Sequence, residues 1–180
     1  MPLFERADLE EALRALVAEL VDAGAEAKIR IVGGAAVVLR VEREAATEDI
    51  DALYQSSTAV KAAVERIADA RNWPVTWLND AVKMYLSNRM SEEDWDLQLE
   101  EGGVTVFVAR PQLLLAMKLK AGRGARDAED IDRLLDACVI VSLESAQEIF
   151  DHLLPRRGHE REGPAPARGP VRRGGWLGAC

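Results

Sequence analysis

The chain has 180 residues, of which 48% are hydrophobic and 5% aromatic, and this fits one compact domain with a single core. Its 23 Lys and Arg against 31 Asp and Glu give a formal charge of -8, which argues against general coating of nucleic acid. The only histidines, His152 and His159, lie near the end of the chain, so residues 1–150 hold no histidine-activated nucleophile. We therefore expect chemistry based on carboxylates, Lys, Arg and backbone groups around a hard cation such as magnesium.

The two cysteines, Cys138 and Cys180, form no CxxC pair and therefore no zinc site of the usual kind. Cys138 lies on an apolar helical stripe, which favours a structural role. The sequence has no charged leader followed by an apolar core and no membrane-spanning apolar run. We therefore expect a cytoplasmic protein without membrane association.

Periodicity and turn residues predict, in the first half of the chain, a helix over 9–21, a strand over 28–32, a short helix over 35–39, a strand over 50–54 and a helix from Thr58 to the break at Trp73-Pro74. A hairpin of strands 96–99 and 104–108 is predicted next. Three helices follow: one from Pro111 to Gly122, one that opens at Asp127 and reaches Cys138, and a last one that is capped by Ser142 and reaches Leu153. Asp8 and Glu11 are placed as the capping pair of the first helix.

The composition changes at Pro155, from where Arg, Gly, Pro and Ala dominate. We predict a domain over residues 1–154 and a disordered tail over 155–180. Residues 151–180 hold six arginines against three acids, so the first 150 residues carry a net charge of -11. The predicted domain is thus more acidic than the whole chain.

Asp49 and Asp51 are expected on one strand, where residues two apart face the same side. At roughly 5 Å and an effective dielectric of about 20, their repulsion costs on the order of 3 kcal/mol, and a divalent cation between them reverses its sign. The pair therefore suits a magnesium site, although such a DxD also occurs by chance in acidic proteins.

Gly33-Gly34 is expected at a strand-to-helix turn, where residues without side chains let a triphosphate approach backbone N–H groups. The alternative for this diglycine is a plain turn. A basic patch follows much later in the chain, with Lys118, Lys120, Arg123 and Arg126 and no acid among them. Such a patch in an acidic domain suits an anionic ligand.

Asp127 and Asp130 come directly after this patch. Asp127 has an alternative role as a helix N-cap, with Asp130 in the first turn. The tryptophans Trp73, Trp77 and Trp95 have two interpretations, stacking on a nucleic-acid base or packing in the core, and packing is the expected one.

These blocks, taken in their order, resemble the nucleotidyltransferase fold of the DNA polymerase beta superfamily. More narrowly, they are similar to small bacterial nucleotidyltransferases related to abortive-infection toxins. The matching residues are Gly33, Gly34, Thr47, Asp49 and Asp51 in the first block, the segment 77–82, and Lys118, Ala121, Arg123, Arg126, Asp127 and Asp130 in the last.

The resemblance implies an α+β fold, a small mixed sheet flanked by helices with a C-terminal helical part. It also implies roles for single residues. Asp49 and Asp51, together with Asp130, would be the metal ligands for Mg2+ or Mn2+, and Asp49, Asp51, Lys118 and Asp127 would be catalytic. Gly33, Gly34, Thr47, Lys118, Arg123 and Arg126 would bind the nucleotide.

The reaction that the resemblance implies is transfer of a nucleoside monophosphate from an NTP to an acceptor. The implied acceptors are a tRNA end, a protein or a small molecule, and the implied partner is an antitoxin. Two departures favour an alternative, a non-catalytic nucleotide-sensing or partner-binding module on the same fold. Ala45 stands where relatives often carry Arg, with Arg43 two residues earlier, and strand 104–108 offers no third acid, so Asp94 or Asp96 would have to substitute.

Overall fold

The computed structural model describes residues 2–41, 46–55, 57–85 and 90–154. The predicted tail from residue 155, together with Arg43 and Ala45, lies outside these ranges. The elements in chain order are α1 (Arg6–Asp22), β1 (Ala27–Val32), α2 (Gly33–Arg40), β2 (Ile50–Tyr54), α3 (Ser57–Arg71), β3 (Leu78–Asn79), η1 (Ala81–Tyr85), η2 (Glu92–Asp94), β4 (Trp95–Glu101), β5 (Val104–Ala109), α4 (Pro111–Ala121), η3 (Gly124–Arg126), α5 (Ala128–Ala137) and α6 (Leu143–Leu153).

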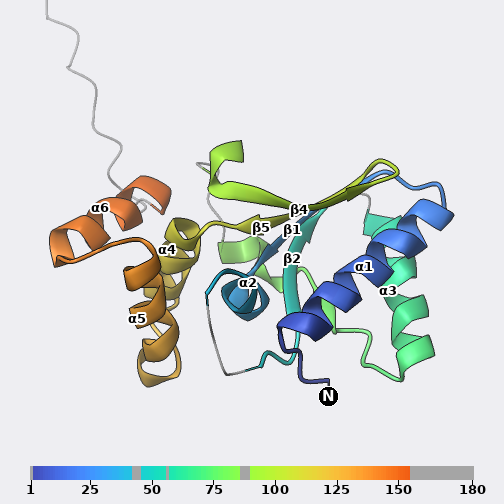
Figure 1. Cartoon of the computed structure of the whole chain (residues 1–180), viewed down its shortest axis with the longest axis horizontal. Coiled ribbons are helices and arrows are strands. Elements are labelled where there is room, and N and C mark those ends of the chain that lie inside the picture. The colour runs from blue at the N-terminus through green and yellow to red at the C-terminus, as the bar shows by residue number, and fades with distance from the viewer. Residues whose placement is uncertain (1, 42–45, 56, 86–89, 155–180) are drawn as a thin grey trace, which may run out of the picture.

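The sheet is mixed, and its strand order is β3-β2-β1-β5-β4. Strand β1 lies at the centre, antiparallel to β2 and parallel to β5, and β3 and β4 form the edges. Figure 1 shows α4, α5 and α6 gathered at one end of the sheet and α1 and α3 at the other. The predicted α+β class with a C-terminal helical part is confirmed.

The two faces of the sheet differ in burial. On β1, Ile29 and Ile31 are fully buried, whereas Lys28 and Arg30, which alternate with them, are half-buried. Helices α1 and α2 pack against the sheet, and their apolar side chains, with those of β1 and β5, form the core. The face that carries Lys28 and Arg30 is therefore the one with polar and charged groups.

Aromatic side chains close the core beside α3. The rings of Phe4, Trp73 and Trp77 contact one another, with centroids 5.1 Å apart for Phe4 and Trp73 and 5.5 Å for Trp73 and Trp77. Trp77 is fully buried, and its indole N–H donates to the Val64 carbonyl at 3.1 Å. Trp95 is also buried. The packing interpretation of Trp77 and Trp95 is confirmed.

Three local predictions need correction. The capping box of α1 pairs Glu5 with Asp8, three residues apart, instead of Asp8 with Glu11, because the helix begins at Arg6. Helix α2 begins at Gly33 itself, so the diglycine is the first turn of a helix and no separate turn precedes it. The short strand β3 and the turns η1 to η3 were not predicted, since two to five residues carry no periodicity.

The remaining helices follow the prediction. Pro111 stands at the first position of α4, Gly122 ends that helix in a left-handed conformation, and the Ser142 side chain caps α6. Helix α4 packs against α2, α5 and α6, so it joins the C-terminal helices to the sheet. None of the helices in the described ranges is long and apolar enough to cross a membrane.

Replacement of Trp77 by Ala removes a fully buried ring and leaves a cavity in the core. We expect Trp77→Ala to lower the free energy of unfolding by about 3–5 kcal/mol in a urea titration. Val75→Ala, two residues away and exposed, is the matched control and should change it by less than about 0.5 kcal/mol. Equal losses in the two variants would contradict the packing role of Trp77.

Candidate functional site

The junction of β1 and α2 brings backbone and carboxylate into close contact. Gly33 has φ +65, a left-handed conformation that favours glycine, and a Cβ built on it would lie 2.3 Å from the Asp51 Oδ2. Asp51 is opposite Val32 in the β1–β2 ladder, and Gly33 directly follows Val32. The Asp51 carboxylate therefore reaches Gly33. Gly33 is therefore required both by its own backbone and by the place of Asp51.

The second acid of the pair stands just outside the strand. Asp49 precedes β2, which begins at Ile50, so only Asp51 lies on the strand as predicted. The Asn79 side-chain amide donates to Asp49 Oδ2 at 3.0 Å, and the Thr47 hydroxyl donates to the Asp49 carbonyl oxygen at 3.2 Å. These contacts hold Asp49 in its place beside Asp51.

The charge of Asp51 is disfavoured by its surroundings. Burial raises the pKa of the Asp51 carboxyl above its ordinary value, and the neighbouring charge of Asp49 raises it further. The positive charge of Arg123, and more weakly that of Lys118, acts in the opposite direction. Burial and the charge of Asp49 together outweigh these cations, so the pKa of Asp51 is raised.

Lys118 of α4 connects the basic patch with the last two acids. Its ammonium donates to Asp127 Oδ1 at 2.8 Å and to Asp130 Oδ2 at 2.7 Å. Both carboxylates are buried, with 3% of each residue exposed, so these ion pairs are shielded from solvent. The pairs tie the start of α5 to α4.

Asp127 has a further oxygen to offer. It occupies the N-cap position of α5 but makes no side-chain cap hydrogen bond, because its carboxylate turns to Lys118 instead. The capping alternative is therefore confirmed in position, with Asp127 at the N-cap and Asp130 in the first turn, but the Asp127 side chain does not cap the helix. Asp127 Oδ2 is buried and has no hydrogen-bond partner within the described part of the chain. A buried carboxylate oxygen without a partner is costly unless a ligand completes it.

A pocket of about 300 Å³ joins these groups. It is lined by Gly33, Gly34, Asp51, Ala81, Val82, Leu114, Met117, Lys118, Lys120, Ala121, Arg123 and Asp127. The pocket thus has the Asp51 carboxylate from β2, the cations Lys118 and Lys120 from α4 with Arg123 just beyond it, and the Asp127 carboxylate paired with Lys118. Six of the predicted site residues, far apart in the sequence, line it together: Gly33, Gly34, Asp51, Lys118, Arg123 and Asp127.

Other predicted residues lie at the margin or elsewhere. Asp49 and Asp130 contact lining residues without lining the pocket themselves, as the contacts above show. Thr47 pairs through its backbone with Phe4, and Arg126 is exposed on η3; neither lines the pocket.

The proposed substitutes for a third strand acid are occupied with other partners. Asp96 is paired with Arg40 and Arg110, and Asp94 accepts from the Ser91 backbone N–H at 2.7 Å. Neither lines the pocket, so the prediction that one of them serves as a third acid there is wrong. Asn79 was missed, because an isolated Asn in an irregular segment carries no signal beyond its place in the segment 77–82.

The donor set of Asp49 and Asp51 fits a hard divalent cation. Magnesium in proteins is commonly held by one or two carboxylates, with water and substrate phosphates as further ligands. Burial, and after it the charge of Asp49, raises the pKa of the Asp51 carboxyl, and a divalent cation would favour its charged form. No cluster of three or more His, Cys, Asp or Glu suited to a metal occurs among the described residues, so the remaining ligands would come from substrate and water.

The contact between Gly33 and Asp51 gives a testable prediction. Gly33→Ala adds a Cβ that clashes with the Asp51 carboxylate, so we expect a loss of about 3 kcal/mol or more in the free energy of unfolding. Gly24 has nearly the same φ of +62 with nothing within 4 Å of a built Cβ, so Gly24→Ala should cost only about 1 kcal/mol. Chemical denaturation measures both, and similar losses would refute the close contact.

The raised pKa of Asp51 predicts a pH dependence. The native state binds this proton more tightly than the unfolded chain, so the unfolding free energy falls as the pH rises through the pKa of Asp51. Asp51→Asn removes this effect. We expect its melting temperature at pH 7 to exceed that of the wild type.

This difference should shrink when the pH is lowered through the carboxyl range. Asp22→Asn, at the exposed end of α1, is the control and should change the melting temperature little at any pH. A constant difference between wild type and Asp51→Asn at all pH values would contradict the prediction.

Comparison with protein-family models gives a match over residues 9–151 to a family described as "Nucleotidyltransferase of unknown function (DUF6036)". No curated protein and no solved structure matches the chain. The matched range includes every residue that lines the pocket. The fold is consistent with that of a nucleotidyltransferase, an enzyme class that uses an NTP as substrate. The chain therefore belongs to the nucleotidyltransferase family DUF6036.

Proposed function

We propose that the chain is a magnesium-dependent nucleotidyltransferase with the fold of the DNA polymerase beta superfamily, acting in the cytoplasm as the toxin of a toxin–antitoxin pair. It transfers a nucleoside monophosphate from an NTP to an acceptor, which is a tRNA end, a protein or a small molecule. Manganese is the alternative ion. The observation that carries this proposal is the pocket in which Asp51, the diglycine and the cations of α4 meet.

Two walls of the pocket suit the triphosphate of an NTP. The backbone of Gly33 and Gly34, at the start of α2, suits phosphate oxygens because no side chain blocks the approach. Arg123 and Lys118 add positive charge on the opposite wall. In the proposed arrangement the triphosphate lies between these walls, with its α-phosphate at the acid pair.

Lys118 has the donors for this role. An ammonium group has three N–H donors, and the hydrogen bonds to Asp127 and Asp130 use two of them. In the proposed arrangement the third donates to a phosphate oxygen. The two buried acids fix the direction of the Lys118 ammonium, so they are positioning residues for it.

In the transfer step, a hydroxyl oxygen of the acceptor forms a bond to the α-phosphorus while the bond between the α- and β-phosphates breaks. Pyrophosphate leaves with the bonding electrons, and the hydroxyl proton passes to solvent. Asp49 and Asp51 would hold a magnesium ion, which would neutralise the charge that develops on the phosphate. The residues of α4 stabilise the departing pyrophosphate.

A transfer assay tests the proposal. The purified chain is incubated with magnesium, each labelled NTP in turn, and total RNA or protein extract. We expect label transfer that falls by about 100-fold or more in Asp49→Ala and Asp51→Ala, since each loses half of the donor set. We also expect the melting temperature of the wild type to rise with NTP and magnesium, and removal of magnesium by a chelator to abolish transfer.

Asp69→Ala is the matched control, because this aspartate lies exposed on α3, away from the pocket. It should retain both label transfer and the NTP-dependent rise in melting temperature. Absence of transfer together with absence of any NTP-dependent stabilisation would overturn the proposal.

A further inference from the structure

A second basic site lies on the polar face of the sheet. Lys28 and Arg30 of β1 share this face, because residues two apart on a strand point to the same side. Arg30 is opposite Leu53 of β2, and Val32 is opposite Asp51, so the face also carries the carboxylate of the candidate site. The two cations and Asp51 are therefore neighbours on one surface.

Aromatic rings hold the two cations in place. The Lys28 ammonium lies 5.0 Å from the centroid of the Phe107 ring, and the Arg30 guanidinium lies 5.1 Å from that of Trp95. Arg30 Nε is buried without a hydrogen-bond partner among the described residues. These contacts fix the direction of both side chains before any ligand binds.

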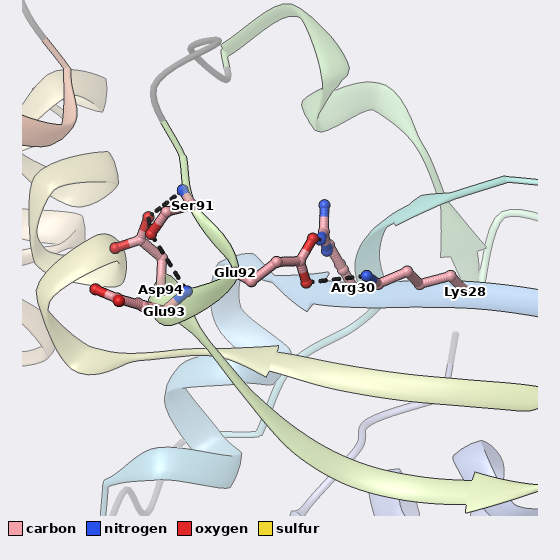
Figure 2. A network of polar contacts seen from close by, with 6 residues as sticks. All are labelled: Lys28, Arg30, Ser91, Glu92, Glu93 and Asp94. Carbon is pink, nitrogen blue, oxygen red and sulfur yellow. Dashed lines mark hydrogen bonds and ion pairs between the residues drawn. The ribbon is translucent and has the colours of Figure 1, made fainter.

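A single carboxylate occupies the two cations in this structure. Glu92 of η2 accepts from the Lys28 ammonium at 2.9 Å and from the Arg30 guanidinium, as Figure 2 shows. The Glu92 side chain is 68% exposed, compared with 35% for Lys28 and 25% for Arg30. The acid therefore reaches over the cations from the solvent side, and exposed pairs of this kind are weak.

Glu92 is held at this position by a capped turn. The Ser91 hydroxyl accepts from the Glu93 backbone N–H at 3.2 Å, and Asp94 Oδ2 accepts from the Ser91 N–H (Figure 2). The turn leads directly into β4. A short, capped turn thus presents one acid to two cations that come from another strand.

A pocket of about 210 Å³ opens beside these cations. The residues that line it are Lys28, Arg30, Leu53, Tyr54, Gln55 and Lys83. This lining has three cations and no carboxylate, in a chain of net charge -8. Lys83 also lies 5.3 Å from the centroid of the Tyr54 ring and pairs with Asp80.

The position of this pocket suits the acceptor of the proposed transfer. Val32 of β1 is opposite Asp51 of β2. The diglycine Gly33-Gly34 follows Val32 in the chain, whereas Lys28 and Arg30 precede it, so the two cations lie on the other side of Asp51 from the diglycine. Leu53 and Gln55 are two and four residues beyond Asp51, which is about 7 and 13 Å along the strand. An in-line displacement brings the acceptor from the side opposite the leaving pyrophosphate.

We propose that Lys28 and Arg30 form a second anion site, which binds the phosphates of a single-stranded nucleic-acid acceptor and which Glu92 occupies in the free protein as a built-in competitor. The acceptor role rests on the proposed nucleotidyl transfer, whereas the binding site stands on its own geometry. When the strand binds, its phosphates replace the Glu92 carboxylate.

The lining favours a nucleic-acid strand over an acidic peptide. Leu53 and Tyr54, both half-buried, line the same pocket as the cations, and Lys83 lies over the Tyr54 ring. Cations along a backbone track with an aromatic surface beside them are typical of single-strand binding, where bases stack on rings. A carboxylate-rich peptide uses the cations and leaves the ring without a role.

A binding titration without NTP tests this site. Fluorescence anisotropy of a labelled single-stranded oligoribonucleotide of about ten nucleotides is measured with the full chain over a range of salt concentrations. We expect Glu92→Gln to tighten binding by about threefold to tenfold, since the competitor loses its charge. We expect Lys28→Gln with Arg30→Gln to weaken binding and to reduce the slope of log affinity against log salt by about 0.7 for each lost contact.

Matched controls come from the helical layer. Arg66 pairs with Glu19 at 2.6 Å between α3 and α1, so Glu19→Gln and Arg66→Gln remove an ion pair of the same kind away from the pocket. Both should leave the affinity unchanged. Because a folding defect weakens binding, the tighter binding of Glu92→Gln distinguishes the proposal from a structural role of these residues.

Unchanged affinity in both the Glu92 and the Lys28/Arg30 variants would overturn the site. So would selective binding of a poly-glutamate peptide over the oligonucleotide. Asp49→Ala should bind the strand normally while losing transfer, so failure of the proposed function and failure of this site give different results.

Discussion

The burial of one carboxylate beside another is the constraint on which the candidate site depends. Asp51 is half-buried beside Asp49, and its carboxylate lies so close to Gly33 that no side chain fits there. Burial and like charge destabilise this arrangement in the absence of a cation. The Asn79 amide and the β1–β2 register nevertheless hold the two acids side by side, so this arrangement lowers the stability of the fold at the candidate site.

The Lys118 ammonium group adds positive charge to the same pocket. Lys118 joins α4 to α5 through Asp127 and Asp130, and α4 packs on α2, the helix that begins with Gly33. The C-terminal helices are thereby connected to the sheet through residues that line the candidate site. Loss of Lys118 would leave two buried acids without their shared cation, which links the integrity of the helical end to that of the site.

Strong periodicity made most elements predictable, whereas short-range geometry did not. The helices α1, α3 and α4 and the hairpin followed from apolar spacing and from the residues Pro111 and Gly102-Gly103. The pairing of Lys118 with Asp127 escaped prediction, because it depends on how two helices meet and not on either sequence alone. Asn79 and Glu92 escaped for the same reason: each lies in an irregular segment, and each contacts a residue far away in the chain.

The edges of the sheet have a consequence for self-association. Strand β3 has only two residues, and β4 is interrupted by a bulge between Leu97 and Leu99 and ends in Glu100 and Glu101. Short, bulged and acidic edges are poor templates for pairing with a strand of another molecule. The sheet is thus protected against edge-to-edge aggregation, and the face that carries Lys28 and Arg30 is more exposed to other molecules than the face covered by α1 and α2.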